Sequence, residues 1–259
     1  MATATSTLAV HKGGRKVSRQ ELASIEPTLP ATRTFKPIPH GELIDTVDYA
    51  LQLRGFEKTR EEFAVSANGA MVFAVMDLAL KSLPGVTAAL GIHASNNKKL
   101  AVKVAVGMRV FCCDNLSLAS DGIALKKKHT VGLNLREQMV SAVDTFSGRY
   151  LAMETQVEAM QHRELSDQEA KALMFDAFRQ QMLAQRFLPA VAKEYFEPKH
   201  VEFEPRTAWS LINAFTEVLK TVEPLPAQEA NFKISRLLGL TSTAGAPQPL
   251  VIDTAAVLV

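Results

Sequence analysis

The sequence predicts an α+β fold in which an antiparallel sheet with β-hairpins packs against helices and the C-terminal half is helical. Two observations carry this prediction. Between residues 56 and 133, short apolar runs alternate with polar residues and are separated by turn pairs, as in antiparallel strands. From about residue 134 the apolar residues recur at helical spacing instead. A β-rich segment followed by a helical segment is typical of the α+β class.

Composition narrows the class of protein. The chain has 259 residues, a net charge of +2 and 47% hydrophobic residues, as expected of a globular protein with a sizeable core. No apolar run reaches the roughly 18 residues of a membrane helix, and the N-terminus lacks an apolar segment of signal-peptide length, so we expect no membrane partner. The only cysteines, Cys112 and Cys113, are adjacent and have no other thiol to pair with, which indicates a reducing, cytoplasmic location.

The chain is expected to divide into three parts. Residues 1–39 are basic and rich in Ser, Thr and Pro, and are expected to form a flexible arm. Residues 40–222 form the core domain, which is β-rich over 56–133 and helical over 134–222. Residues 223–259 form a tail that ends on an apolar segment. Exchange of this segment between subunits and docking on its own domain fit the pattern equally well.

Turn pairs place the β-hairpins in the first half of the core domain, after a helix predicted over residues 41–56 by apolar spacing. Asn68-Gly69 within residues 61–78 predicts a hairpin, because this pair favours the tight turn between antiparallel strands. Pro84-Gly85 predicts a second turn, followed by a strand at residues 86–95.

The next stretch is expected to continue the sheet. Residues 98–115 alternate between apolar and polar side chains and are rich in valine, which favours a strand over a helix. The segment from 116 to 130 is expected to follow as strand, with a turn at Asp121-Gly122.

Helical signals dominate the second half of the core domain. Ser166 followed by Glu169 is a capping box that begins a helix, and residues 207–221 predict a further helix. An apolar stripe at helical spacing is formed by Met139, Val140, Val143, Phe146, Leu151, Val157 and Met160.

Positive charge concentrates between residues 91 and 130, although the whole chain is nearly neutral. Cations interleaved with β-forming residues predict a sheet edge or groove that faces a polyanion, and a solvated basic face fits the same run. Because Phe73 and Phe111 are the aromatic residues at hand, we expect contacts to phosphates with little readout of bases. The candidate nucleic-acid-binding residues are Lys98, Lys99, Lys103, Arg109, Lys126, Lys127, Lys128 and His129.

Enzymatic signatures are mostly missing from the sequence, although its 27 acidic residues leave two-carboxylate chemistry open. It contains no dinucleotide-binding, phosphate-loop, zinc-protease or nucleophile-elbow motif, and its six histidines are scattered. Cys112 and Cys113 lack the spacing of a metal site, so no metal and no cofactor is expected. His93 and His129 bracket the basic segment, and an acid–base pair formed by them across the sheet is the enzymatic alternative.

Two blocks of the sequence resemble a known family. The first block is HASNNKKLAVKVAVGMRVFCCDNLSL with the later LKKKHT, and the second block is TAWSLINAFTEVLK. The chain is similar to the phage- and plasmid-associated domain of unknown function 932 over residues 40–222. The second block carries its Trp209, Asn213, Ala214, Thr216 and Glu217. The chain departs from the family where Cys113, Asp114 and Asn115 replace a frequent Ser-Asn-Gly. Because members occur on mobile elements, the resemblance implies a role in DNA maintenance, recombination or defence evasion.

These observations predict a nucleic-acid-binding protein of phage or plasmid type. We expect it to bind or anneal single-stranded DNA as a homo-oligomer, since the order of its elements resembles the core of single-strand-annealing recombinases. The alternative is a self-assembling structural or host-interaction protein without affinity for nucleic acid. Trp209 is expected to pack between the helical and sheet halves, and Asn213 to bond a buried backbone group.

Overall fold

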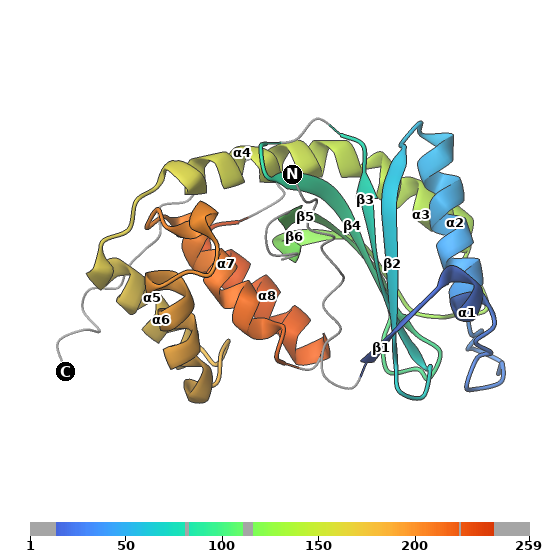
Figure 1. Ribbon diagram of the computed structural model, residues 1–259. Coiled ribbons are helices and arrows are strands. Elements are labelled where there is room, and N and C mark those ends of the chain that lie inside the picture. The colour runs from blue at the N-terminus through green and yellow to red at the C-terminus, as the bar shows by residue number, and fades with distance from the viewer. Residues whose placement is uncertain (1–13, 81–82, 111–115, 223, 241–259) are drawn as a thin grey trace.

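A six-stranded antiparallel sheet forms the centre of the molecule in the computed structural model, which describes residues 14–80, 83–110, 116–222 and 224–240. Each strand pairs with the next one along the chain, so the sheet is a simple meander (Figure 1). The strands are β1 Gly14–Val17, β2 Lys58–Ser66, β3 Met71–Leu78, β4 Val86–Ser95, β5 Val102–Val110 and β6 Leu116–Lys127. This sheet and the helices that follow it confirm the predicted α+β class.

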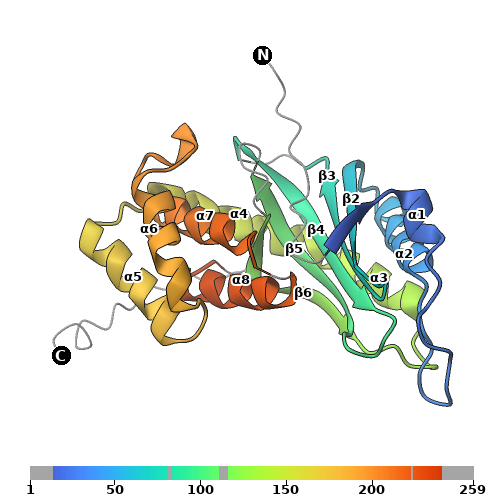
Figure 2. The same ribbon diagram turned by 60° about the horizontal axis from the view of Figure 1, so that its bottom comes forward.

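The helices flank this sheet on one side and beyond one edge. Figures 1 and 2 show α2 and α3 together on one side of the sheet, and α7 and α8 beside the edge strand β6. They are α1 Arg19–Ala23, α2 His40–Leu53, α3 Leu135–Asp144, α4 Phe146–His162, α5 Asp167–Arg179, α6 Leu188–Phe196, α7 Ala208–Leu219 and α8 Pro224–Leu238, with short 3-10 turns η1 Gln185–Phe187 and η2 Val201–Phe203. No helix in the described ranges is long and apolar enough to cross a membrane.

Strand alternation decides which side chains enter the main core. In β5, Val102, Val104 and Val106 point toward the helices and are fully buried, while Lys103 lies between them on the opposite face. That opposite face carries a small apolar cluster of Ala64, Val75 and Ala89 with Phe73 against it. The alternation read from the sequence therefore identifies both faces of the sheet.

The predicted hairpin turns are confirmed, with one exception. Asn68 accepts hydrogen bonds from Ser66 and from the Ala70 amide, and Gly69 takes the left-handed conformation that this turn needs, with φ +69°. The turn predicted at Asp121-Gly122 is wrong, because β6 runs through both residues. The pairing register between β5 and β6 shifts at this point, so the extra residues form a bulge instead of reversing the chain.

Two helices of the second half begin where their sequence signals predict. The capping box of Ser166 and Glu169 opens α5, and Thr207 caps α7 with its side-chain oxygen. Leu151 departs from the predicted apolar stripe, because it is 62% exposed on α4. An apolar spacing alone does not say which side of so long a helix meets the core.

Both ends of the described chain pack on the core domain. β1 pairs with β2, and α1 approaches α2 so closely that a Cβ on Gly41 would lie 3.1 Å from the Cα of Ala23. At the other end, α8 buries Ala227 and Ile234 beside β6 and α7. Residues 14–39 and 224–240 are therefore parts of the fold, whereas residues 1–13 and the apolar end segment at 241–259 lie outside the described residues.

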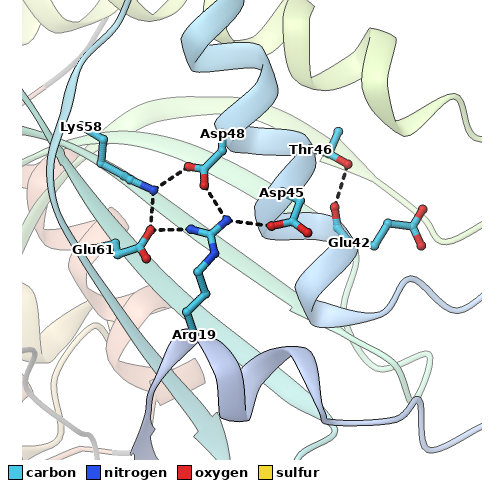
Figure 3. A network of polar contacts seen from close by, with 7 residues as sticks. All are labelled: Arg19, Glu42, Asp45, Thr46, Asp48, Lys58 and Glu61. Carbon is cyan, nitrogen blue, oxygen red and sulfur yellow. Dashed lines mark hydrogen bonds and ion pairs between the residues drawn. The ribbon is translucent and has the colours of Figure 1, made fainter.

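A network of ion pairs fastens the N-terminal segment to the core (Figure 3). The guanidinium of Arg19, at the start of α1, contacts Asp45 at 2.7 Å, Asp48 at 2.5 Å and Glu61 at 2.8 Å. Lys58 of β2 joins Asp48 and Glu61 from the other side. Burial lowers the pKa of Arg19, but its three carboxylate partners outweigh burial and raise the pKa above its ordinary value.

Replacing Arg19 by alanine is expected to loosen β1 without unfolding the domain. The pairs are partly exposed, so the loss is about 1 kcal/mol, and exchange of the β1 amide hydrogens should rise about fivefold. Hydrogen exchange measures this rise. The control Arg179→Ala removes an exposed pair with Asp176 within one helix and should leave β1 exchange unchanged. Equal β1 exchange in both variants would contradict the fastening role.

Candidate nucleic-acid interface

Six lysines meet at one end of the sheet. Lys98 and Lys99 lie in the turn between β4 and β5, and Lys103 follows at the start of β5. The strand register pairs Lys103 with Lys126 near the end of β6. We call this group the lysine end; its members are Lys98, Lys99, Lys103, Lys126, Lys127 and Lys128. The sequence left open whether the two lysine clusters are neighbours, and the register shows that they are.

The lysine end is exposed and lacks carboxylate partners. All its members are exposed except Lys103, which is half-buried. Among the described residues, no carboxylate lies within ion-pair distance of any of the six. Cations elsewhere, such as Arg19, Arg54 and Lys199, do have such partners. Positive charge at this end of the sheet is therefore uncompensated within the described part of the chain.

Electrostatic crowding is visible at Lys103. Burial lowers its pKa, and the neighbouring ammonium group of Lys126 lowers it further, while Glu229 of α8 acts in the opposite direction. The net result is a pKa below the ordinary value of lysine. An anion placed beside Lys103 and Lys126 would relieve this repulsion.

Arg109 does not belong to this exposed group, which corrects its place in the predicted groove. It lies near the other end of β5, is 2% exposed, and contacts Asp77 at 2.9 Å and Glu62 at 3.1 Å. Burial raises the pKa of Glu62, but hydrogen bonds from Lys16, Arg60 and Arg109 outweigh it and hold the pKa below its usual range. Arg109 is thus part of a buried ion-pair network within the fold.

His129 is also buried, although the sequence grouped it with the exposed lysines. It follows Lys128 and lies beside Phe35, with 6.1 Å between the ring centroids. Neither ring nitrogen of His129 has a hydrogen-bond partner among the described residues. Burial lowers the pKa of His129, and the nearby His40 lowers it further. The ring is therefore kept neutral and faces the interior instead of a phosphate.

His40 and Asn96 complete a buried polar cluster with His129. His40 Nε2 lies 2.9 Å from the Gly69 carbonyl oxygen and donates to it, and its Nδ1 lies 3.4 Å from Asn96 Nδ2. Burial lowers the pKa of His40 in spite of the bond to Gly69. The Oδ1 atom of Asn96 has no partner among the described residues. Sequence reasoning missed His40 and Asn96, because the chain separation between them hides the contact.

The enzymatic alternative required His93 and His129 to meet. His93 packs against Phe73 on the sheet face opposite the main core, with ring centroids 6.5 Å apart, whereas the ring of His129 packs against Phe35 and feels the charge of His40. No described contact joins the two rings. Within the described residues there is also no cluster of three or more metal-ligating side chains. Phe111, Cys112 and Cys113 lie outside the described residues.

A pocket of about 410 Å³ lies at the opposite end of β5 from the lysines. The pocket lies between the helical half and the sheet, where β4 begins and β5 ends, and Trp209 of α7 is part of its lining. Trp209 is buried at this junction, as the sequence predicted, and Asn213 donates to its carbonyl oxygen at 2.9 Å. These two residues of the second sequence block therefore have structural roles. The lining comprises Pro84, Gly85, Val86, Val110, Gln161, Glu202, Phe203, Pro205, Thr207, Trp209 and Ser210.

Comparison with known proteins gives one result. Residues 31–239 match the family model described as "Domain of unknown function (DUF932)". No curated protein and no solved structure matches the chain. The matched range includes the whole sheet except β1, the lysine end, the His40–Asn96–His129 cluster and both sequence blocks of the resemblance. The chain therefore belongs to the DUF932 family.

Proposed function

We propose that the protein binds nucleic acid, and single-stranded DNA in particular, through the lysine end. One observation carries the proposal: the β5–β6 register sets Lys103 beside Lys126 within a group of exposed lysines that have no carboxylate partner. Like charges held together destabilise a folded protein, and a polyanion removes that cost when it binds. With a net charge of only +2, the chain does not attract anions uniformly over its surface.

The proposed contacts are to phosphates and not to bases. Lysine ammonium groups act as point charges on flexible stems, which suits a row of phosphates and carries no sequence information. Base stacking needs exposed aromatic rings. Phe35 is buried under Lys98, and Phe73, two strands from Lys103 in the register, is half-buried and packs against His93. Binding should therefore show little sequence preference.

Three further properties remain proposals. A homo-oligomer and a cytoplasmic location are what the sequence leads us to expect, and a phage- or plasmid-type role in recombination or DNA maintenance is what the family resemblance implies. A mass measurement of the full chain in solution, free and with oligonucleotide, tests the first. It also separates this proposal from a self-assembling protein without affinity for nucleic acid, which would form the oligomer and leave the oligonucleotide unbound.

The salt dependence of binding is the direct test of a phosphate interface. For a single strand, the slope of log affinity against log salt is roughly −0.7 per neutralised phosphate, so contacts by three to six lysines predict a slope of about −2 to −4. Between about 50 and 200 mM salt the affinity should fall about 16- to 250-fold. Fluorescence anisotropy with a labelled oligothymidylate measures it, with duplex DNA and RNA as comparison ligands. An affinity that does not change with salt concentration, or an absence of binding, would contradict the proposal.

A further inference from the structure

Residues 30–39, here called the strap, cross the lysine end before α2 begins. Phe35 forms a β-bridge with Thr130, just after the end of β6. The Lys36 amide donates to the His129 carbonyl oxygen at 3.3 Å, and the Val131 amide donates to the Thr34 carbonyl oxygen at 3.4 Å. The strap is therefore bound to the segment that follows β6 by a few long hydrogen bonds, which are weaker than those of a full strand pair.

The Phe35 side chain anchors the strap between two basic residues. It is 6% exposed, and its ring lies against the ring of His129. On its other side, the Lys98 ammonium group lies 4.9 Å from the ring centroid. Lys98 adopts a φ of 66°, a left-handed conformation that residues other than glycine seldom take. The structure thus holds Lys98 in an unusual backbone conformation over the strap.

The strap ends in the buried cluster of His40, Asn96 and His129. Three polar atoms there have no partner among the described residues: both ring nitrogens of His129 and Oδ1 of Asn96. Because these atoms are polar, an opening of the strap that admits bulk water would let them form hydrogen bonds.

The charged and titratable groups around His129 are basic. They are His40 from α2, Lys36 from the strap, Lys98 from the β4–β5 turn and Lys128, which precedes His129 in the chain. None of these four forms an ion pair with a carboxylate of the described residues. A proton added to His129 would therefore be buried beside His40, with no carboxylate of the described residues as a counter-charge.

We propose that the strap is a proton-operated latch, which opens when His129 and His40 take up protons and then exposes the buried ring of Phe35. Both rings are held neutral in the closed form, as the lowered pKa of each indicates. In the open form they meet water and titrate near pH 6.5. The open form therefore binds more protons, so the closed form is stable above about pH 6.5 and is lost as the pH falls below it.

The regulatory meaning of the latch rests on the proposed function. The open strap frees the Phe35 ring for stacking on a base, beside Lys98, which is exposed in the closed form as well. The affinity for single-stranded DNA should then be higher below about pH 6.5 than at neutral pH.

Hydrogen exchange of the full chain tests the latch without any nucleic acid. We expect exchange of the Lys36 and Val131 amides, corrected for intrinsic rates, to be faster at about pH 5.5 than at about pH 7.5. The rise should be about tenfold if one histidine takes up a proton and about a hundredfold if both do. Amides in the middle of β4 serve as the internal reference and should not change. A flat response at Lys36 and Val131 would overturn the proposal.

Neutral substitutions identify the proton acceptors. His129→Gln and, separately, His40→Gln should each reduce the pH response about tenfold, because glutamine does not titrate. The control His162→Gln replaces an exposed histidine on α4 and should leave the response intact. In the natural chain, the nuclear magnetic resonance signal of the His129 ring should show no titration near pH 6.5. An ordinary titration of His129 there, or an unchanged pH response in His129→Gln, would refute the latch.

The two proposals fail in different ways. If strap exchange follows pH as expected but no oligonucleotide binds at any pH, the latch stands and the nucleic-acid function is wrong. If an oligonucleotide binds with the expected salt slope while strap exchange ignores pH, the function stands and the latch is wrong. If both hold, affinity measured at about pH 5.5 should fall to the level at about pH 7.5 in the His40→Gln, His129→Gln double variant.

Discussion

A variant carrying Lys126→Glu, Lys127→Glu and Lys128→Glu is expected to bind single-stranded DNA at least about tenfold more weakly than the natural chain at moderate salt. Each substitution replaces an attractive charge at the lysine end by a repulsive one, beside Lys103 across the strand pair. All three side chains are exposed, so folding should change by no more than about 0.5 kcal/mol per site. The salt slope should also become shallower, because fewer phosphates are neutralised.

A matched control separates a local effect from a change in net charge. Lys171→Glu, Arg186→Glu and Lys193→Glu impose the same change in charge on exposed residues of α5, η1 and α6. Anisotropy titrations should show nearly natural affinity for this control. If both triple variants lose affinity equally, only net charge matters and the lysine end is not the interface. If neither loses affinity, the lysine end is a solvated face.

Local sequence signals predicted most of the secondary structure because their physical causes are local. Valine alternation determines which face of β5 meets the core, and Asn68-Gly69 imposes a turn through the backbone freedom of glycine. The same signal failed at Asp121-Gly122. The register shift between β5 and β6 takes up the extra residues inside β6, so this pair lies in a bulge of a long strand instead of a turn.

The C-terminal helix shows a second limit of local reading. Pro224 and Pro226 indicated the start of a tail, yet α8 begins at Pro224. Proline lacks an amide hydrogen, and the first turn of a helix leaves its amides unbonded in any case, so proline is tolerated there. The burial of Ile234 and Leu238 against the core then decides that the segment is part of the domain.

The candidate site depends on contacts between residues far apart in the chain, and a single sequence does not reveal these. Positive charge alone placed Arg109 with the lysines, but its partner carboxylates are 32 and 47 residues away along the chain. Asn96 and His40 are separated by 56 residues. Only the strand register and the packing of α2 bring such groups together, so the sequence identified the lysines and missed the cluster beneath them.

Replacing Arg109 by methionine is expected to destabilise the protein by about 3–5 kcal/mol, the largest stability effect among these variants. Methionine fills a similar volume but leaves Asp77, which is 4% exposed, and Glu62 without the guanidinium that compensates their charge. Urea unfolding followed by circular dichroism measures the loss. Arg54→Met is the matched control, because Arg54 pairs with Asp144 at the surface and should cost no more than about 1 kcal/mol.

The pH dependence of this loss identifies its cause. In the natural chain the pKa of Glu62 lies below its ordinary value, so the ionised carboxylate contributes stability above about pH 4.5 that is lost as the pH falls through the lowered pKa. The difference between Arg109→Met and the natural chain should therefore shrink in acid. A difference that stays constant, or a cost no larger than that of Arg54→Met, would contradict the buried ion-pair account. The folded fraction of Arg109→Met should keep its affinity for single-stranded DNA, because Arg109 is buried away from the lysine end. A loss of affinity without a loss of stability would instead indicate that Arg109 contacts the nucleic acid.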